Sequence, residues 1–307
     1  MTAGMIAFTT ALLASGVRLT VPILVTALGE LVSERAGVIN LGLEGMMISG
    51  SLAAFALAGL SGNLILGILG GVVAGTVMGM VMVLVAVRRR SNQLVTGFAI
   101  TVFGLGITSF LYAQYGETLP PIVTLPELRV PVLAALPIIG GGLFDQNVLA
   151  YASLGLTVVV ALMLRRTRFG LQVLATGNDP AAAAAKGVRV GRVQTAATLF
   201  AAACAGLGGA AMSLGSVGNF GPNMTAGRGF VAIAVVILGR WKPSWTLLGA
   251  LIFGLADSLQ LRLQDLVRVP TDLLPGLPWV VVVGLLIVGS RWTHMPKALG
   301  QDLALEE

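Results

Sequence analysis

The feature that most constrains this chain is the length of its segments without a charged residue. The segment from Gly45 to Val87 contains no ionisable side chain. About 20 apolar residues form a helix that crosses the ~30 Å hydrocarbon core of a bilayer, so this segment is long enough for two membrane spans joined by a turn near 60–63. Only 10% of the residues are charged and 56% are hydrophobic, whereas soluble domains carry about 25% charged residues. The composition excludes a soluble enzyme, a disordered chain and a nucleic-acid-binding module.

Several other segments have the length and composition of a span. They cover residues 6–31, 91–116, 146–164, 193–227, 243–261 and 273–290. Backbone polar groups must be satisfied within the bilayer, which favours helices. The sequence predicts an all-α fold: a polytopic transmembrane helix bundle of about eight or nine spans, with broken helices, in a single domain over residues 1–307. The count stays open because the stretch 213–238 contains a break.

The basic residues predict the orientation, because cytoplasmic loops accumulate Lys and Arg. Thirteen fall in one set of alternate loops: Arg88, Arg89, Arg90, Arg165, Arg166, Arg168, Lys186, Arg189, Arg192, Arg240, Lys242, Arg291 and Lys297. The other loops hold four: Arg129, Arg228, Arg262 and Arg268. We therefore expect the larger group, and the C-terminus, in the cytoplasm and the N-terminus outside. Membrane topology then accounts for the basic net charge, and no nucleic-acid partner is expected.

Two loops between spans have distinctive compositions. The external loop 117–147 carries five prolines followed by Gly140, Gly141 and Gly142. Prolines at that density favour extended, semi-rigid backbone, which fits a surface for docking a partner or a plain connector. The second loop, 165–192, lies among the cytoplasmic basic residues.

The 165–192 loop contains the pattern of a short helix. Asp179 suits the N-cap position, Pro180 the first helical position and Gly187 the termination, with alanines between them. An isolated helix of about two turns is marginal in water, and an alanine face has little apolar bulk to bury. The pattern predicts a cytoplasmic helix that docks on another protein; an incidental loop helix is the alternative.

Two polar, glycine-rich breaks interrupt the apolar segments, at 34–47 and at 218–230. Broken backbone at membrane depth is tolerated only when it is buried in protein or lines a water-filled cavity, and paired breaks are typical of a transport route between structural repeats. The candidate pathway residues are Asn40, Glu44, Asn92, Gln93, Asn219, Asn223 and Arg228. Asn92 and Gln93 have an equally good explanation as helix-boundary residues, and Glu34 and Arg35 are assigned a structural or coupling role.

Four glycines at a spacing of four residues, Gly67, Gly71, Gly75 and Gly79, predict a face where a neighbouring helix backbone approaches closely. The chain has no Ser/His/Asp set, no His-x-x-x-His spacing and no Gly-x-x-x-x-Gly-Lys-Ser/Thr loop. We therefore expect no catalytic residue, no metal site and no ATP site in this subunit.

The motifs resemble the permease subunits of bacterial ABC importers. The resemblance rests on Glu34–Met47, on Gly-x-x-Pro-x-Ala-Ala at 177–183, and on Met224–Phe230 with Gly239-Arg240-Trp241. The matching branch serves branched-chain amino acids, ribose-type sugars and nucleosides, and the first and third motifs are most similar to its nucleoside members. The sequence departs from the family's loop pattern at Asp179, where relatives often have Asn, and at Ala181, where an acidic residue is common.

By this resemblance, residues 178–187 form the coupling helix that seats in an ATPase subunit. The coupling residues are Gly177, Asn178, Asp179, Pro180, Ala182, Ala183 and Gly187. The resemblance implies an inner-membrane permease that imports a nucleoside-like solute by alternating access. Its implied partners are an ABC ATPase carrying ATP and Mg, a second permease that is a paralogue, an extracytoplasmic substrate-binding protein, and membrane lipid.

Three groups of alternatives stay open. An ABC permease of this type could instead carry a simple sugar, a branched-chain amino acid or riboflavin. An ion-coupled secondary transporter or channel would need no ATPase. An integral membrane enzyme would form a product by itself.

Overall fold

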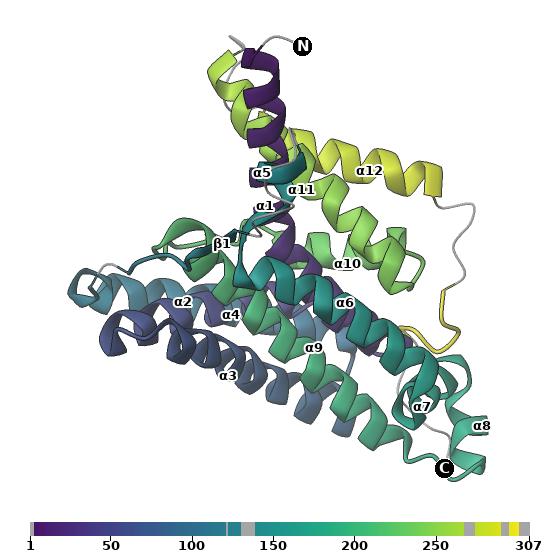
Figure 1. Ribbon diagram of the computed structural model, residues 1–307. Helices are drawn as coiled ribbons and strands as arrows, with labels where there is room; N and C mark the ends of the chain where they lie inside the picture. The colour runs from purple at the N-terminus through teal and green to yellow at the C-terminus, as the bar shows by residue number, and fades with distance from the viewer. Residues whose placement is uncertain (1–2, 121, 130–138, 267–273, 290–294, 301–307) are drawn as a thin grey trace.

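The computed structural model describes residues 3–120, 122–129, 139–266, 274–289 and 295–300. The fold is all-α apart from one small two-stranded sheet (Figure 1). The longer helices are α1 (Ala3–Arg35), α2 (Leu43–Ser61), α3 (Leu64–Met82), α4 (Gln93–Tyr115), α6 (Val148–Arg166), α9 (Val190–Met212) and α11 (Pro243–Leu266). The shorter helices are α5 (Ile139–Leu143), α7 (Arg168–Asn178), α8 (Pro180–Ala185), α10 (Arg228–Leu238) and α12 (Leu277–Gly289). Single turns of π-helix, η1 (Val83–Arg88) and η3 (Ser213–Val217), extend α3 and α9, and 3-10 turns lie at η2 (Gly116–Thr118) and η4 (Leu274–Gly276).

Among the described residues, seven helices are long and apolar enough to cross a membrane, and α10 is a shorter apolar helix. The expected number was eight or nine. The difference arises in the C-terminal half of the chain. Helix α10 has only 11 residues, because the polar break at 218–230 occupies part of the segment 213–238. The expected span 273–290 corresponds to α12, which has 13 described residues. The predicted turn near 60–63 is confirmed, since α2 ends at Ser61 and Asn63 caps α3.

The centre of the molecule is built on close glycine contacts between α2, α3 and α9. A Cβ atom added at Gly50 would lie 2.6 Å from Gly206 Cα, and one at Gly75 would also lie 2.6 Å from Gly206 Cα. A Cβ atom at Gly71 would lie 3.0 Å from the Gly50 carbonyl oxygen. The predicted glycine face of α3 is therefore confirmed as the packing surface against two neighbouring helices.

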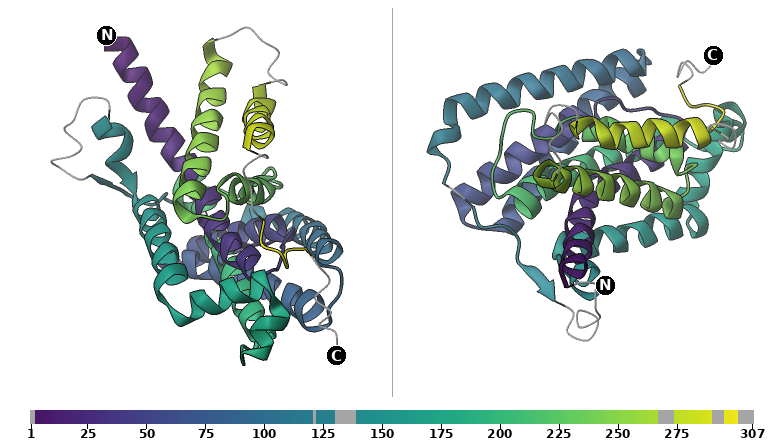
Figure 2. Two further views of the ribbon diagram at one scale, coloured as in Figure 1. Left: turned by 90° about the vertical axis from the view of Figure 1, so that its right-hand side faces the viewer. Right: turned by 90° about the horizontal axis from the view of Figure 1, so that it is seen from above.

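Most of the described basic residues lie at helix termini at one end of the bundle, including the ends of η1, α6 and α8. Contacts between segments join this end. The Gln93 side-chain oxygen accepts a hydrogen bond from the Ile39 amide at 2.8 Å, and the Ala298 amide donates to the Gly177 carbonyl at 3.0 Å. At the other end, the amino-terminal half of α1 projects beside α11 (Figures 1 and 2), where Arg262 contacts Ser15. The N-terminus and the basic ends thus lie on opposite sides.

The 117–147 loop is partly folded onto the bundle. Strand β1 (Glu127–Arg129) pairs antiparallel with β2 (Asp145–Asn147). Gly140, Gly141 and Gly142 lie in the short helix α5, and a Cβ atom at Gly142 would lie 2.8 Å from the Leu13 Cβ atom of α1. Pro121, Pro131 and Pro137 lie outside the described residues.

Candidate transport site

The two polar breaks meet at the Glu44 side chain. Glu44 lies in the first turn of α2 and is 2% exposed. Its Oε1 atom accepts hydrogen bonds from the Thr225 hydroxyl at 2.5 Å and the Gly227 amide at 2.8 Å, and its Oε2 atom accepts one from the Gly229 amide at 2.7 Å. The two amides belong to the N-terminus of α10, where the helix dipole favours a negative group. Glu44 therefore joins the N-termini of α2 and α10, which are far apart in the sequence.

The first break is held by side chains that satisfy its backbone. The Asn40 side-chain oxygen accepts from the Gly42 amide at 2.9 Å, which closes a turn just before α2. Glu30 of α1 accepts from the Asn40 amide at 2.9 Å, and Gln93 accepts from the Ile39 amide. Asn40, Glu30 and Gln93 are all buried. These contacts explain how non-helical backbone is accommodated between two spans.

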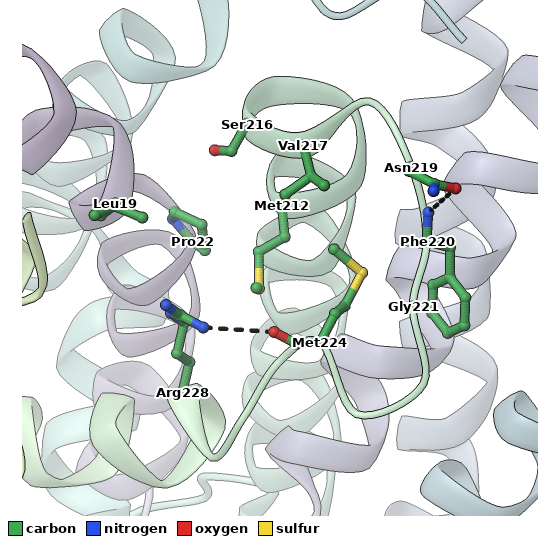
Figure 3. A pocket seen from close by; sticks show the side chains of 10 residues that line it. All are labelled: Leu19, Pro22, Met212, Ser216, Val217, Asn219, Phe220, Gly221, Met224 and Arg228. Atoms are coloured by element: carbon green, nitrogen blue, oxygen red, sulfur yellow. Dashed lines mark hydrogen bonds between the residues drawn. The ribbon is translucent and has the colours of Figure 1, made fainter. Parts of the chain in front are cut away.

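The second break borders a cavity of about 290 Å³ that lies between the middle of α1 and residues 212–228 (Figure 3). Three of its ten lining residues have polar side chains: Ser216, Asn219 and Arg228. The others are Leu19, Pro22, Met212, Val217, Phe220, Gly221 and Met224. In Figure 3, Leu19 and Pro22 lie across from Met212 and Met224, with Arg228 below them. The volume is close to the lower limit of small-molecule sites, about 300 Å³.

Arg228, which lines this cavity at the start of α10, is fixed by an ion pair. Its Nη2 atom lies 2.6 Å from the Asp257 Oδ2 atom of α11, with side chains 19% and 10% exposed. Its Nη1 atom also donates to the Met224 carbonyl at 3.4 Å. A charge-assisted bond of this length is stronger than a neutral one, so the guanidinium is oriented by α11 and the break.

The predicted coupling segment has the capping expected from the sequence. The Asp179 side chain accepts from the Ala182 amide at 2.9 Å, Pro180 begins α8, and Gly187 follows its end with φ +83°. Gly177 and Asn178 belong to the preceding helix α7 rather than to α8. Ala182 is exposed and Ala183 is buried.

The C-terminal end of α1 lies between this segment and the α10–α11 connection. A Cβ atom at Gly177 would collide with the Arg35 carbonyl oxygen. The Arg35 guanidinium donates to the Trp241 carbonyl at 2.8 and 3.1 Å, and the Trp241 indole N–H donates to Glu34 Oε2 at 2.5 Å. Glu34 and Arg35 therefore hold one tryptophan by both its backbone and its side chain.

The candidate pathway residues divide into three groups. Asn219 and Arg228 line the cavity. Asn40, Glu44 and Gln93 are buried: Asn40 and Gln93 bond to the backbone of the first break, and Glu44 joins the two breaks. The remaining two do not line the cavity: Asn92 is the exposed N-cap of α4, and Asn223 is exposed with φ +59°.

Four residues important to this geometry were not selected from the sequence: Glu30, Thr225, Asp257 and Trp241. Glu30 and Asp257 are carboxylates inside apolar helices, a placement costly enough to indicate a specific role. Trp241 was noted only as part of a motif. Thr225 also appeared only within a motif, Met224–Phe230, and its role depends on a partner 181 positions away in the sequence.

Known proteins support a transport role. A family model described as the permease component of branched-chain amino acid transport systems matches residues 12–289. A putative glucose ABC transporter permease of Haloferax volcanii is 37% identical over 84% of this chain and 79% of its own length. A nucleoside ABC transporter permease of Lactococcus lactis is 28% identical over 91% and 92%, and a guanosine ABC transporter permease of Bacillus subtilis is 30% identical over 78% of each chain. No solved structure matches the chain.

The fold and the family match together define a multi-pass membrane protein of the transport class. The chain belongs to the permease family of branched-chain amino acid-type ABC importers. It is a transport subunit and not an enzyme.

Proposed function

We propose that this permease moves a nucleoside-like solute inward by alternating access, through a path that includes the cavity beside α1. The cavity carries the proposal, because it is of small-solute size and is bordered by the second break. It is also bounded by Arg228 at the N-terminus of α10, the helix end to which Glu44 is bonded. A change in the position of α10 would therefore alter the wall of the cavity.

The chemistry of the lining favours a nucleoside. A hexose presents hydroxyl groups around its whole ring, and each one buried without a partner costs free energy. A nucleobase has flat faces of low polarity, which suit the thioethers of Met212 and Met224. Asn219 offers its NH2 group as a donor for a base edge, while its oxygen also accepts from the Phe220 amide at 2.8 Å, and Ser216 offers a hydroxyl for a ribose.

A hexose is the second candidate, because one relative at 37% identity is named as a putative glucose permease. The names of the other two relatives, for a nucleoside and for guanosine, agree with the first candidate.

The partners are proposed on the same basis. The permease family implies an ATPase subunit with its own ATP and Mg, and an extracytoplasmic binding protein. Two different permeases of Haloferax volcanii, a putative glucose permease and a glucose permease, match this chain at 37% and 26% identity. This match of two permeases from one organism supports a paralogous second permease. We place the protein in the inner membrane with the basic end of the bundle on the cytoplasmic side, following the distribution of Lys and Arg.

The test is uptake by vesicles that contain the reconstituted complex and the binding protein. Labelled guanosine should enter with ATP, and excess nucleoside should compete whereas glucose, leucine and riboflavin should not. Asn219→Ala should reduce uptake about threefold to tenfold, the effect of one hydrogen bond. Gln114→Ala is the matched control, because Gln114 is an exposed amide of α4 that does not line the cavity.

Three results would contradict the proposal. Competition by glucose and not by nucleosides would identify a hexose permease. Competition by leucine or riboflavin would point to those solutes. Uptake that follows an ion gradient and persists without ATP would indicate a secondary transporter.

A further inference from the structure

The short helix α10 connects the two ends of the candidate transport machinery. Its N-terminus holds Arg228 at the cavity and donates two amide hydrogen bonds to Glu44. It ends at Leu238, and Trp241, three residues further on, is bonded to Glu34 and Arg35. At about 1.5 Å per residue, its 11 residues span roughly 16 Å.

Trp241 lies in the connection between α10 and α11, and both its backbone and its side chain are held by hydrogen bonds. Arg240 and Trp241 both have positive φ values, +52° and +53°. Non-glycine residues rarely adopt this conformation and keep it only when the surroundings determine it. Here, the Trp241 carbonyl accepts two bonds from Arg35, the indole donates to Glu34, and the side chain is 2% exposed.

The coupling segment packs against the end of α1 that holds Trp241. Trp241 belongs to a buried apolar cluster that also contains Ala36 at the end of α1, Val173 of α7 and Leu299, with Val188 packed against it. Gly177 lies against the Arg35 backbone, and the Ala298 amide donates to the Gly177 carbonyl at 3.0 Å. A displacement of α7 and α8 therefore reaches Arg35 and Trp241 through contacts between closely packed groups.

We propose that Trp241 is a positioning residue that transmits movement of the coupling segment, through α10, to Arg228 at the cavity. The proposal rests on the proposed function and on a role of residues 177–187 in coupling to the ATPase, which the family resemblance predicts. Glu34 and Arg35 attach Trp241 to the end of α1, so that α1 and α10 move together at this end. At the other end, the bonds to Glu44 determine how far the N-terminus of α10 can shift against α2.

The test measures access to the cavity directly, so it does not depend on which solute is carried. In a chain with Cys204→Ala, Ser216→Cys places a thiol on the cavity wall, where Ser216 is exposed. The rate of its reaction with a membrane-impermeant thiosulfonate is measured in the assembled complex, without nucleotide and with ATP and vanadate. Trp241→Phe is then added, which keeps an aromatic ring but removes the indole N–H that donates to Glu34.

We expect the nucleotide to change the reaction rate in the parent complex, and Trp241→Phe to reduce that change about threefold to tenfold, as for loss of one buried hydrogen bond. ATPase co-purification and basal ATP hydrolysis should persist. Trp245→Phe is the matched control: it is the same substitution at the start of α11, at a side chain that is 52% exposed, and it should preserve the full change.

A normal nucleotide response in Trp241→Phe would overturn the proposal, and so would loss of ATPase co-purification, because Trp241 would then serve assembly alone. If Trp241→Phe does not accumulate in the membrane, Glu34→Gln provides the second test, since it weakens the same bond from the acceptor side. Failure of nucleoside uptake with an intact thiol response would refute only the proposed solute. Absence of any nucleotide response in the parent complex would refute the coupling proposal.

Discussion

Replacing Glu44 by glutamine removes one oxygen acceptor from a site where three donors converge. The Thr225 hydroxyl and the Gly227 amide share one carboxylate oxygen, and the Gly229 amide uses the other. A glutamine side chain has one oxygen and one amide nitrogen. In its best orientation it keeps the first two bonds and turns its NH2 group toward the Gly229 N–H, so that two donors face each other.

The expected loss follows from the burial of the site. An amide left without a partner at a buried position costs about 1–3 kcal/mol, and Glu44 is 2% exposed. Loss of the negative charge at the N-terminus of α10 adds about 0.3–2 kcal/mol. The sum of about 1–5 kcal/mol corresponds to a fall in unfolding temperature of about 2–8 °C for a chain of this size.

Thermal unfolding of the purified permease in detergent measures this fall, followed by tryptophan fluorescence. Glu117→Gln, at an exposed glutamate of η2, makes the same chemical change and should leave the unfolding temperature within about 1 °C. Thr225→Val should have a smaller effect than Glu44→Gln, and the double variant should be less destabilised than the sum, because both changes remove one shared bond. An unfolding temperature for Glu44→Gln equal to that of Glu117→Gln would refute the reasoning.

Further predictions concern packing, capping and the ion pair. Gly75→Ala should lower the free energy of unfolding by about 1–3 kcal/mol because its Cβ would meet backbone, whereas Gly106→Ala on α4, with open space around it, should be neutral or slightly stabilising; denaturant unfolding compares the two. Asp179→Ala should destabilise α8 by about 1 kcal/mol and reduce the ATPase that co-purifies, whereas Asp179→Asn should retain it because Asn also caps helices; equal loss in both would contradict a capping role. Asp257→Asn should reduce uptake about tenfold, because it removes the charge that orients the Arg228 guanidinium at the cavity while keeping one oxygen acceptor, and unchanged uptake would show that the pair does not orient Arg228.

Local features were predictable where the sequence determines them over a few residues. Asp179, Pro180 and Gly187 specify the cap, start and end of α8 by their backbone preferences, and these are confirmed. The glycine spacing along α3 likewise predicted a close-packed face. The position of both breaks was evident because polar and glycine residues interrupt otherwise apolar runs.

Partners across the fold were not predictable from one sequence. Asn92 was considered for the pathway, yet its amide oxygen accepts from the Leu94 and Val95 amides and caps α4. Glu44 was recognised as needing a partner, but the choice of Thr225 and two amides depends on how α10 folds back onto α2. Asp257 was overlooked, although a carboxylate and the Arg228 guanidinium within apolar segments could have been considered as a pair.

The crossing of α2, α3 and α9 has a consequence for how the molecule can change shape. Where Gly50, Gly71 and Gly206 meet, backbone rests directly on backbone, so there are no rotamers through which these three helices could slide to a second register. We therefore expect this part to act as a stiff frame that keeps one geometry during transport. Conformational freedom must then reside in elements held by side-chain contacts, and labels attached to the frame should keep constant spacing while those on α10 move.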